Sequence, residues 1–195
     1  MAGDWLAASR TEAAADRILD AAAELFATRD AAAVGMNEIA TAAGCSRATL
    51  YRYFENREAL HTAFVNREAY RLHHELSDQI RVMQDPGERL VAGVTTALRI
   101  VRSSPALASW FATTQPPIGG EMAEQSEVIK ALTAAFLNSL DPDDPAVVER
   151  RARWLVRVIT SLLVFPGTDE ADEKQMLLDF VLPFIVSAVS TTASV

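Results

Sequence analysis

Apolar residues recur along this chain with the spacing of helix faces rather than of strands. Ile18, Ala22, Leu25 and Phe26, for example, follow the i, i+4, i+7, i+8 pattern of a single buried stripe. Alternation with a period of two is rare, and the good helix formers Ala, Leu, Arg and Glu are abundant. We therefore expect an all-α protein of 195 residues, a length at which a chain buries most of its apolar surface.

Capping residues and glycines divide the N-terminal part into four helices. A capping box at Ser9 and Glu12 predicts that the first helix begins there, and the pattern fades near Arg29. Three further helices are predicted to start at N-caps, which are Gly35, Ser46 and Asn56. Gly44 is suited to end the second helix, so the second and third helices are short and joined by a tight turn.

Prolines and glycines punctuate the rest of the chain, where the helices are longer. We expect the fourth helix to run past residue 74 and later helices to begin near residues 86, 105, 121, 145 and 169. Residues 115–120 are predicted to form a loop, residues 121–140 one unbroken helix, and Pro183 a kink or restart of the last helix. The tail from Thr191 is expected to fray.

Composition excludes several classes of protein. Half of the residues are hydrophobic and 23% are charged, which is typical of a folded, water-soluble domain. A single cysteine, Cys45, excludes an intrachain disulfide and a cysteine-based zinc site, and the three histidines suggest no metal cluster. No apolar run reaches membrane-spanning length and the start does not resemble a signal peptide. We expect a cytoplasmic protein without a metal or cofactor.

Residues 36–54 fit a helix-turn-helix, in which the second helix enters the major groove of DNA. With Leu50 and Phe54 turned inward, the outward or flanking residues of that helix are Ser46, Arg47, Thr49, Tyr51, Arg52 and Tyr53. Arginine can donate two hydrogen bonds to a guanine edge, and hydroxyl groups reach phosphates. The net charge of −8 argues against nucleic acid only on average, because residues 45–57 carry three arginines against one glutamate.

Residues 35–60 resemble the DNA-binding signature of the TetR/AcrR family of bacterial transcription regulators. The matching pairs are Ile39-Ala40, Ala43-Gly44, Leu50-Tyr51 and Tyr53-Phe54, followed by Glu58-Ala59-Leu60. Four positions depart from the usual pattern: Gly35, Cys45, Ala48 and Arg57. Gly35 lacks the hydroxyl group that often touches a phosphate, whereas Arg57 keeps the charge of the usual lysine.

The resemblance implies a role for each matching residue. It places Arg47, Ala48, Tyr51 and Arg52 against base edges, and it assigns the DNA backbone to Ser46, Thr49, Tyr53 and Arg57. It also implies a flexible tail over residues 1–8, a DNA-binding domain over 9–56, and an effector-binding and dimerisation domain over 57–195. The expected function is a homodimeric repressor that binds a palindromic double-stranded DNA operator and is released by a largely apolar small molecule.

Candidates for the effector pocket and the dimer interface follow from apolar patterning. The pocket candidates are Trp110, Phe111, Met122, Phe136 and Trp154, although such residues at helical spacing more often form core. The helix ending near residue 165 has two apolar faces, and the interface candidates are Val158, Ser161, Leu162, Phe165, Leu177 and Val181. The arginines at positions 150, 151, 153 and 157 are expected to form ion pairs with Glu149 or with acids of the final helix, and binding of an anionic ligand such as an acyl-CoA is the alternative.

Three other functions remain possible from the sequence. A helical carrier or sensor could retain a vestigial DNA-binding segment, and a helical enzyme could use the same bundle, although no catalytic motif is present. An architectural DNA-binding protein would occupy many scattered sites rather than a few promoters. The prediction made here is a regulator and not an enzyme.

Overall fold

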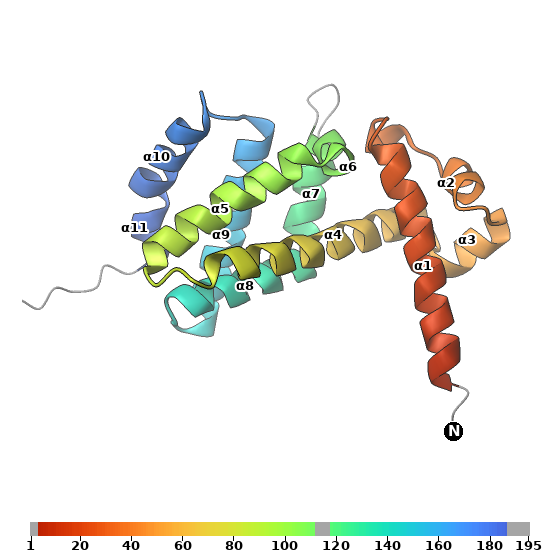
Figure 1. Ribbon diagram of the computed structural model, residues 1–195, viewed down its shortest axis with the longest axis horizontal. Helices are drawn as coiled ribbons and strands as arrows, with labels where there is room; N and C mark the ends of the chain where they lie inside the picture. Colours follow the sequence, from red (N-terminus) through yellow and green to blue (C-terminus); the bar gives the residue numbers. More distant parts are fainter. Residues whose placement is uncertain (1–3, 112–117, 187–195) are drawn as a thin grey trace, which may run out of the picture.

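The computed structural model describes the backbone of residues 4–111 and 118–186 and the side chains from residue 11 onward within those ranges. Within these ranges the chain is helical and contains no strand, as expected. The helix-turn-helix end consists of α1 (Asp4–Phe26), the 3₁₀ turn η1 (Ala31–Ala33), α2 (Met36–Ala42) and α3 (Arg47–Tyr53). The long helix α4 (Arg57–Ile80) leads from that end into the rest of the molecule (Figure 1).

The larger part of the fold is a bundle around α4. Its elements are α5 (Pro86–Ser103), α6 (Pro105–Ala108), η2 (Ser109–Phe111), α7 (Ile118–Gln125), α8 (Glu127–Leu140), α9 (Pro145–Val164), α10 (Glu170–Phe180) and α11 (Leu182–Ile185). Figure 1 shows α10 and α11 on the side of the bundle remote from α1, α2 and α3. In the described ranges no helix combines the length and the apolar character needed to span a membrane.

Side-chain caps fix many of the helix starts, including the two predicted at Ser46 and Asn56. The hydroxyl oxygen of Ser46 accepts a hydrogen bond from the N–H of Thr49 (3.0 Å), and the carboxamide oxygen of Asn56 accepts one from Ala59 (2.7 Å). Asp85 caps α5 in the same way. Such a cap satisfies a backbone donor that the helix itself leaves unpaired, so these local signals are readable from sequence.

Three boundaries differ from the sequence prediction. Helix α1 already begins at Asp4, so Ser9 lies inside the helix and the predicted capping box does not start it. The expected helix over residues 121–140 is two helices, because the Ser126 hydroxyl caps α8 by accepting from Ile129 N–H and also lies 2.8 Å from Asn66 Oδ1. Helix α7 starts at Ile118, inside the predicted loop. The predicted frayed tail lies outside the described residues.

Two hydrophobic clusters organise the molecule. The first joins α1, α2 and α3 to the N-terminal half of α4 and includes Phe26, Ile39, Leu50 and Phe64. The second lies among α5, α8, α9, α10 and α11. Because α4 contributes to the first cluster and then forms a wall of the bundle, it connects the two parts mechanically.

Candidate nucleic-acid interface and internal cavity

The turn between α2 and α3 depends on a left-handed glycine. Gly44 has φ of +65°, a conformation that other residues adopt at a cost because their Cβ meets the backbone. Its N–H donates to the carbonyl of Thr41 (3.1 Å), and the N–H of Cys45 donates to that of Ala40 (3.0 Å). These bonds close the end of α2 and set the direction in which α3 leaves.

Helix α3 is held by two buried side chains and presents its other face to solvent. Leu50 and Phe54 pack into the first cluster with Ile39 and Phe26. The exposed residues are Ser46, Arg47, Ala48, Tyr51 and Arg52, and Thr49 and Tyr53 are half-buried at the edge. The structure thus brings the predicted contacts of α3 together on one outward surface, which we call the α3 face.

The two arginines of the α3 face are stacked on tyrosines rather than tied to carboxylates. The guanidinium of Arg47 lies 5.3 Å from the ring centre of Tyr51, and that of Arg52 lies 5.4 Å from the ring of Tyr53. Neither guanidinium forms an ion pair or a hydrogen bond with another residue in the described part of the chain. Their hydrogen-bond donors are therefore free for base edges or phosphates.

Arg57 differs from the other predicted contacts, because its side chain is partly engaged within the subunit. Its Nη1 donates to the carbonyl of Ala32 (2.9 Å), which ties the start of α4 to η1. The side chain remains exposed. A guanidinium has five N–H donors, so the others can still reach a phosphate.

A second local network, which the sequence did not reveal, anchors α2. The N–H of Gly35 donates to Glu38 Oε2 (2.9 Å), and Arg29 forms an ion pair with the same carboxylate. The hydrogen bonds from Arg29 and then Gly35 lower the pKa of Glu38. Glycine at this cap therefore keeps its backbone role even though it lacks a hydroxyl.

A cavity of about 200 Å³ lies between α4 and the helices α5, α7, α8 and α9. Three of the candidates for the effector pocket, Trp110, Phe111 and Phe136, line it. Two predicted lining residues do not: Met122 packs against the first hydrophobic cluster, and Trp154 is 40% exposed and faces Phe184. Both are apolar, but their helices turn them away from the cavity.

The main wall that sequence reasoning missed is the inner face of α4. It consists of Val65, Glu68, Ala69, Leu72, His73, Leu76, Ser77 and Ile80. Their i, i+3, i+4 spacing was a usable signal, because such a stripe must face something apolar in a helix this long. The periodicity alone does not distinguish a cavity from a packed core.

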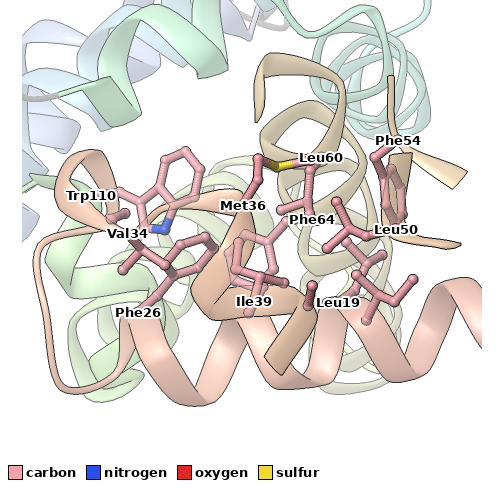
Figure 2. Packing of buried hydrophobic residues seen from close by; sticks show 14 residues of the cluster. Leu19, Phe26, Val34, Met36, Ile39, Leu50, Phe54, Leu60, Phe64 and Trp110 are labelled. Atoms are coloured by element: carbon pink, nitrogen blue, oxygen red, sulfur yellow. The ribbon is translucent and has the colours of Figure 1, made fainter. Parts of the chain in front are cut away.

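Trp110 belongs both to the cavity wall and to the core of the helix-turn-helix end. Figure 2 shows its indole beside Phe26 and Val34, with Phe64 from α4 nearby. The ring stacks on Phe64 (5.6 Å between centroids, 11° between planes) and meets Phe26 and His61 edge-on at 5.4 and 4.9 Å. One rigid side chain therefore touches both the internal cavity and the helices that carry α3.

The predicted dimer-interface residues divide into buried and exposed sets. Leu162, Leu177 and Val181 are buried in the second cluster of the subunit's own core, so their assignment to a surface was wrong. They face inward because α9 and α10 pack against α5 and α8 on that side. Val158 is half-buried against the same cluster, whereas Ser161 and Phe165 are exposed.

The exposed apolar surface of α9, α10 and α11 is larger than predicted. We call it the α9–α11 face, and its large side chains are Trp154 (40% exposed), Phe165 (73%), Met176 (37%), Phe180 (67%) and Phe184 (69%). Trp154 and Phe184 lie 6.4 Å apart, centre to centre. So many large apolar groups on neighbouring helices are unusual for a surface that meets only water.

Ion pairs account for several charged groups of the bundle. Arg157 binds Glu124 through two nitrogens, and Arg151 lies 3.2 Å from Asp143. Two of the four clustered arginines therefore form ion pairs, but neither of these partners is Glu149 or an acid of the final helix, which were the partners expected from the sequence. A further pair was not predicted. The buried Glu173 accepts hydrogen bonds from both terminal nitrogens of Arg102 (2.7 and 2.8 Å), which lower its pKa. This pair fastens α10 to α5.

Comparison with known proteins agrees with this architecture. The family model described as bacterial regulatory proteins, tetR family, matches residues 18–64. The chain is 66% identical over 189 residues to an uncharacterized HTH-type transcriptional regulator, Rv1255c, of Mycobacterium tuberculosis strain H37Rv, a match that covers 96% of this chain and 94% of that protein.

Solved structures share the fold. AlkX from Dietzia, a TetR family repressor implicated in biodegradation of n-alkanes, superposes with a TM-score of 0.63 at 25% identity over 87% of this chain and 93% of that one. FadR from Thermus thermophilus, a repressor in complex with lauroyl-CoA, gives 0.63 at 23% identity over 93% and 100%. RolR in complex with resorcinol gives 0.72 at 18% identity over 93% and 92%.

The family match falls on the helices that form the α3 face, and the relatives and structural neighbours are regulators rather than enzymes. The chain therefore belongs to the TetR family of bacterial transcriptional regulators.

Proposed function

We propose that the protein is a dimeric repressor that holds a near-palindromic operator and releases it when a small molecule fills the cavity. Its DNA contacts are the α3 face, with Arg47, Ala48, Tyr51 and Arg52 at base edges. Ser46, Thr49, Tyr53 and Arg57 hold the DNA backbone. The unpaired state of Arg47 and Arg52 supports this assignment, because a guanidinium without a carboxylate partner keeps its donors for DNA. Repression is proposed on the likeness to AlkX.

The dimer is proposed to form through the α9–α11 face. Phe165, Phe180 and Phe184 are each about two-thirds or more exposed in the single subunit, and burial against a second copy would remove that surface from water. A two-fold pair presents two α3 helices, which fit major grooves one helical turn apart, about 34 Å. The division into a DNA-binding part over residues 9–56 and an effector and dimerisation part over 57–195 follows this assignment.

Trp110 is the observation that carries the ligand response. The indole lines the cavity, where a ligand would meet it, and it also contacts Phe26 of α1 and Phe64 of α4. A shift of the indole must therefore displace α1 and α4, which carry α3. A change of spacing between the two α3 helices lowers operator affinity, and by linkage the operator lowers ligand affinity by the same factor.

The experiment is selection of operator sequences from random DNA with the full-length protein, followed by mobility shifts at several salt concentrations. The proposal expects a short inverted repeat, bound by two subunits, with an affinity that falls as salt rises. Binding without sequence preference would favour an architectural protein. No DNA binding by a folded dimer would favour a carrier or sensor.

A further inference from the structure

The cavity offers no counter-charge to an anionic ligand. Among the side chains that the structure describes, no lysine or arginine lines it. The segments 112–117 and 187–195 contain neither residue type in the sequence. The wall does contain a carboxylate, Glu68, which already pairs with Arg67 (3.2 Å) and Arg71 (3.0 Å). The other titratable group of the wall is His73.

The cavity is long because one face of α4 forms its wall. The lining residues of that helix run from Val65 to Ile80, a span of roughly 22 Å at 1.5 Å per residue. A volume of about 200 Å³ spread along such a wall is a channel rather than a round chamber. An extended chain matches this form better than a compact ring system does.

Two aromatic rings of the channel wall lie directly against glycine backbone. A Cβ atom at Gly93 would lie 2.9 Å from the ring of Phe136, so that ring rests directly on the backbone of α5. At Gly119, a Cβ atom would lie 2.8 Å from the ring of Phe111. Both glycines and both rings line the cavity.

Polar groups are few in the channel, and most are neutral. The hydroxyl groups of Ser77, Thr133 and Thr160 line it, and none of them makes a side-chain hydrogen bond with another residue in the described ranges. A hydroxyl group can donate to a carbonyl oxygen or accept from an alcohol. The wall can therefore satisfy an uncharged polar group, whereas its described part offers a carboxylate no lysine or arginine.

We propose that the effector is an uncharged, elongated aliphatic molecule with a hydroxyl or carbonyl group, and that the corresponding carboxylate is excluded. This inference rests on the proposed function, in which the cavity is the effector site. Transfer of an unpaired carboxylate from water into an apolar channel is far more costly than transfer of a hydroxyl group. A fatty acid would have to enter in its protonated form, which is about one part in 1,000 at pH 7.3 for a pKa near 4.3.

The test compares 1-decanol with decanoate by isothermal titration calorimetry of the full-length protein at pH 7.3, without DNA. The expected result is saturable binding of 1-decanol and binding of decanoate that is about 100- to 1,000-fold weaker. Thr133→Lys places an ammonium group in the channel and is expected to shift the preference toward decanoate at least tenfold. Thr133→Met is the matched control, which adds a side chain of similar length without charge and should keep the wild-type preference.

Equal affinity of the wild-type protein for 1-decanol and decanoate would overturn the inference, whether or not the lysine variant folds. Binding of neither compound, with binding of a compact aromatic such as resorcinol, would overturn the elongated shape. If the proposed function is wrong but this inference about the ligand is right, the experiments give a different result. The protein would bind 1-decanol selectively, but its selected DNA would be unaffected by the alcohol or would not exist.

Discussion

His61 makes the stability of the protein depend on pH. The imidazole is 6% exposed and lies between Phe26 (5.6 Å) and Trp110 (4.9 Å). Its Nε2 has no hydrogen-bond partner among the described residues. Burial, and secondly the charge of Arg57, lower the pKa of His61 from 6.5 to about 4. The perturbation that tests this is His61→Phe, which keeps a ring in the aromatic cluster and removes the titration.

The sign and size of the effect of His61 on the free energy of unfolding follow from proton linkage. Between pH 6.5 and 4 the unfolded chain binds a proton at His61 and the folded protein does not, so the free energy of unfolding falls as pH falls through this range. With these two pKa values, the loss between pH 7.5 and pH 5 is at most about 2 kcal/mol. For a chain of this length that loss corresponds to a fall in Tm of about 4 to 8 °C.

Urea unfolding followed by circular dichroism at pH 5 and pH 7.5 measures the effect. The wild-type protein should lose about 2 kcal/mol more than His61→Phe over that interval, and at pH 7.5 the variant should be as stable as wild type or more so. Glu38, Glu124 and Glu173 have lowered pKa values, so their protonation belongs to lower pH and is common to both proteins. Parallel losses in the two proteins would refute the neutral, buried state of His61.

Three further predictions concern DNA, assembly and coupling. Arg47→Ala should weaken operator binding by about 1–3 kcal/mol and relax the sequence preference at one base position, as measured by mobility shifts. The control is Arg81→Ala, because Arg81 is exposed at the far end of α4. Equal effects of the two substitutions would refute the assignment of the α3 face to DNA. Phe165→Arg should cost about 2–4 kcal/mol of dimer affinity in analytical ultracentrifugation with little change in subunit stability, whereas Tyr70→Arg on α4 should leave the dimer intact. An unchanged dimer in the Phe165 variant would exclude the α9–α11 face. Trp110→Phe should retain DNA and ligand binding but reduce the coupling between them, normally about 1–3 kcal/mol, and undiminished coupling would exclude the indole as the link.

The helix-turn-helix end was predictable because its signals are local. The caps at Ser46 and Asn56 and the left-handed Gly44 each act within a few residues, so the sequence carries both the signal and the partner. The break at Ser126 was not predictable, because part of its reason is Asn66, which lies 60 residues earlier in the chain. Neither proline nor glycine marks that site.

The residues of the proposed dimer interface could not be predicted from local sequence signals, because α9 is apolar on more than one side. Leu162 and Phe165 are three residues apart on this helix, yet one is in the core and the other is exposed. Periodicity identifies apolar faces but does not say whether a face meets α5 and α8 of the same subunit or something outside it. Only the packed structure distinguishes an apolar face buried within the subunit from one that is exposed.

The pattern of ion pairs explains how an acidic chain can present a basic surface to DNA. The carboxylate of Asp20 on α1 lies 2.8 Å from Arg67, and Glu38 on α2 is paired with Arg29. Acids near the helix-turn-helix are thus partly neutralised inside the subunit, whereas Arg47 and Arg52 on α3 have no carboxylate partner among the described residues. Because a screened charge acts over about 10 Å or less at physiological salt, the local balance on α3 matters more for DNA than the net charge of −8. Few basic contacts also predict a shallow salt dependence, so we expect the affinity for the proposed operator to depend largely on base contacts and on the proposed pairing of two subunits.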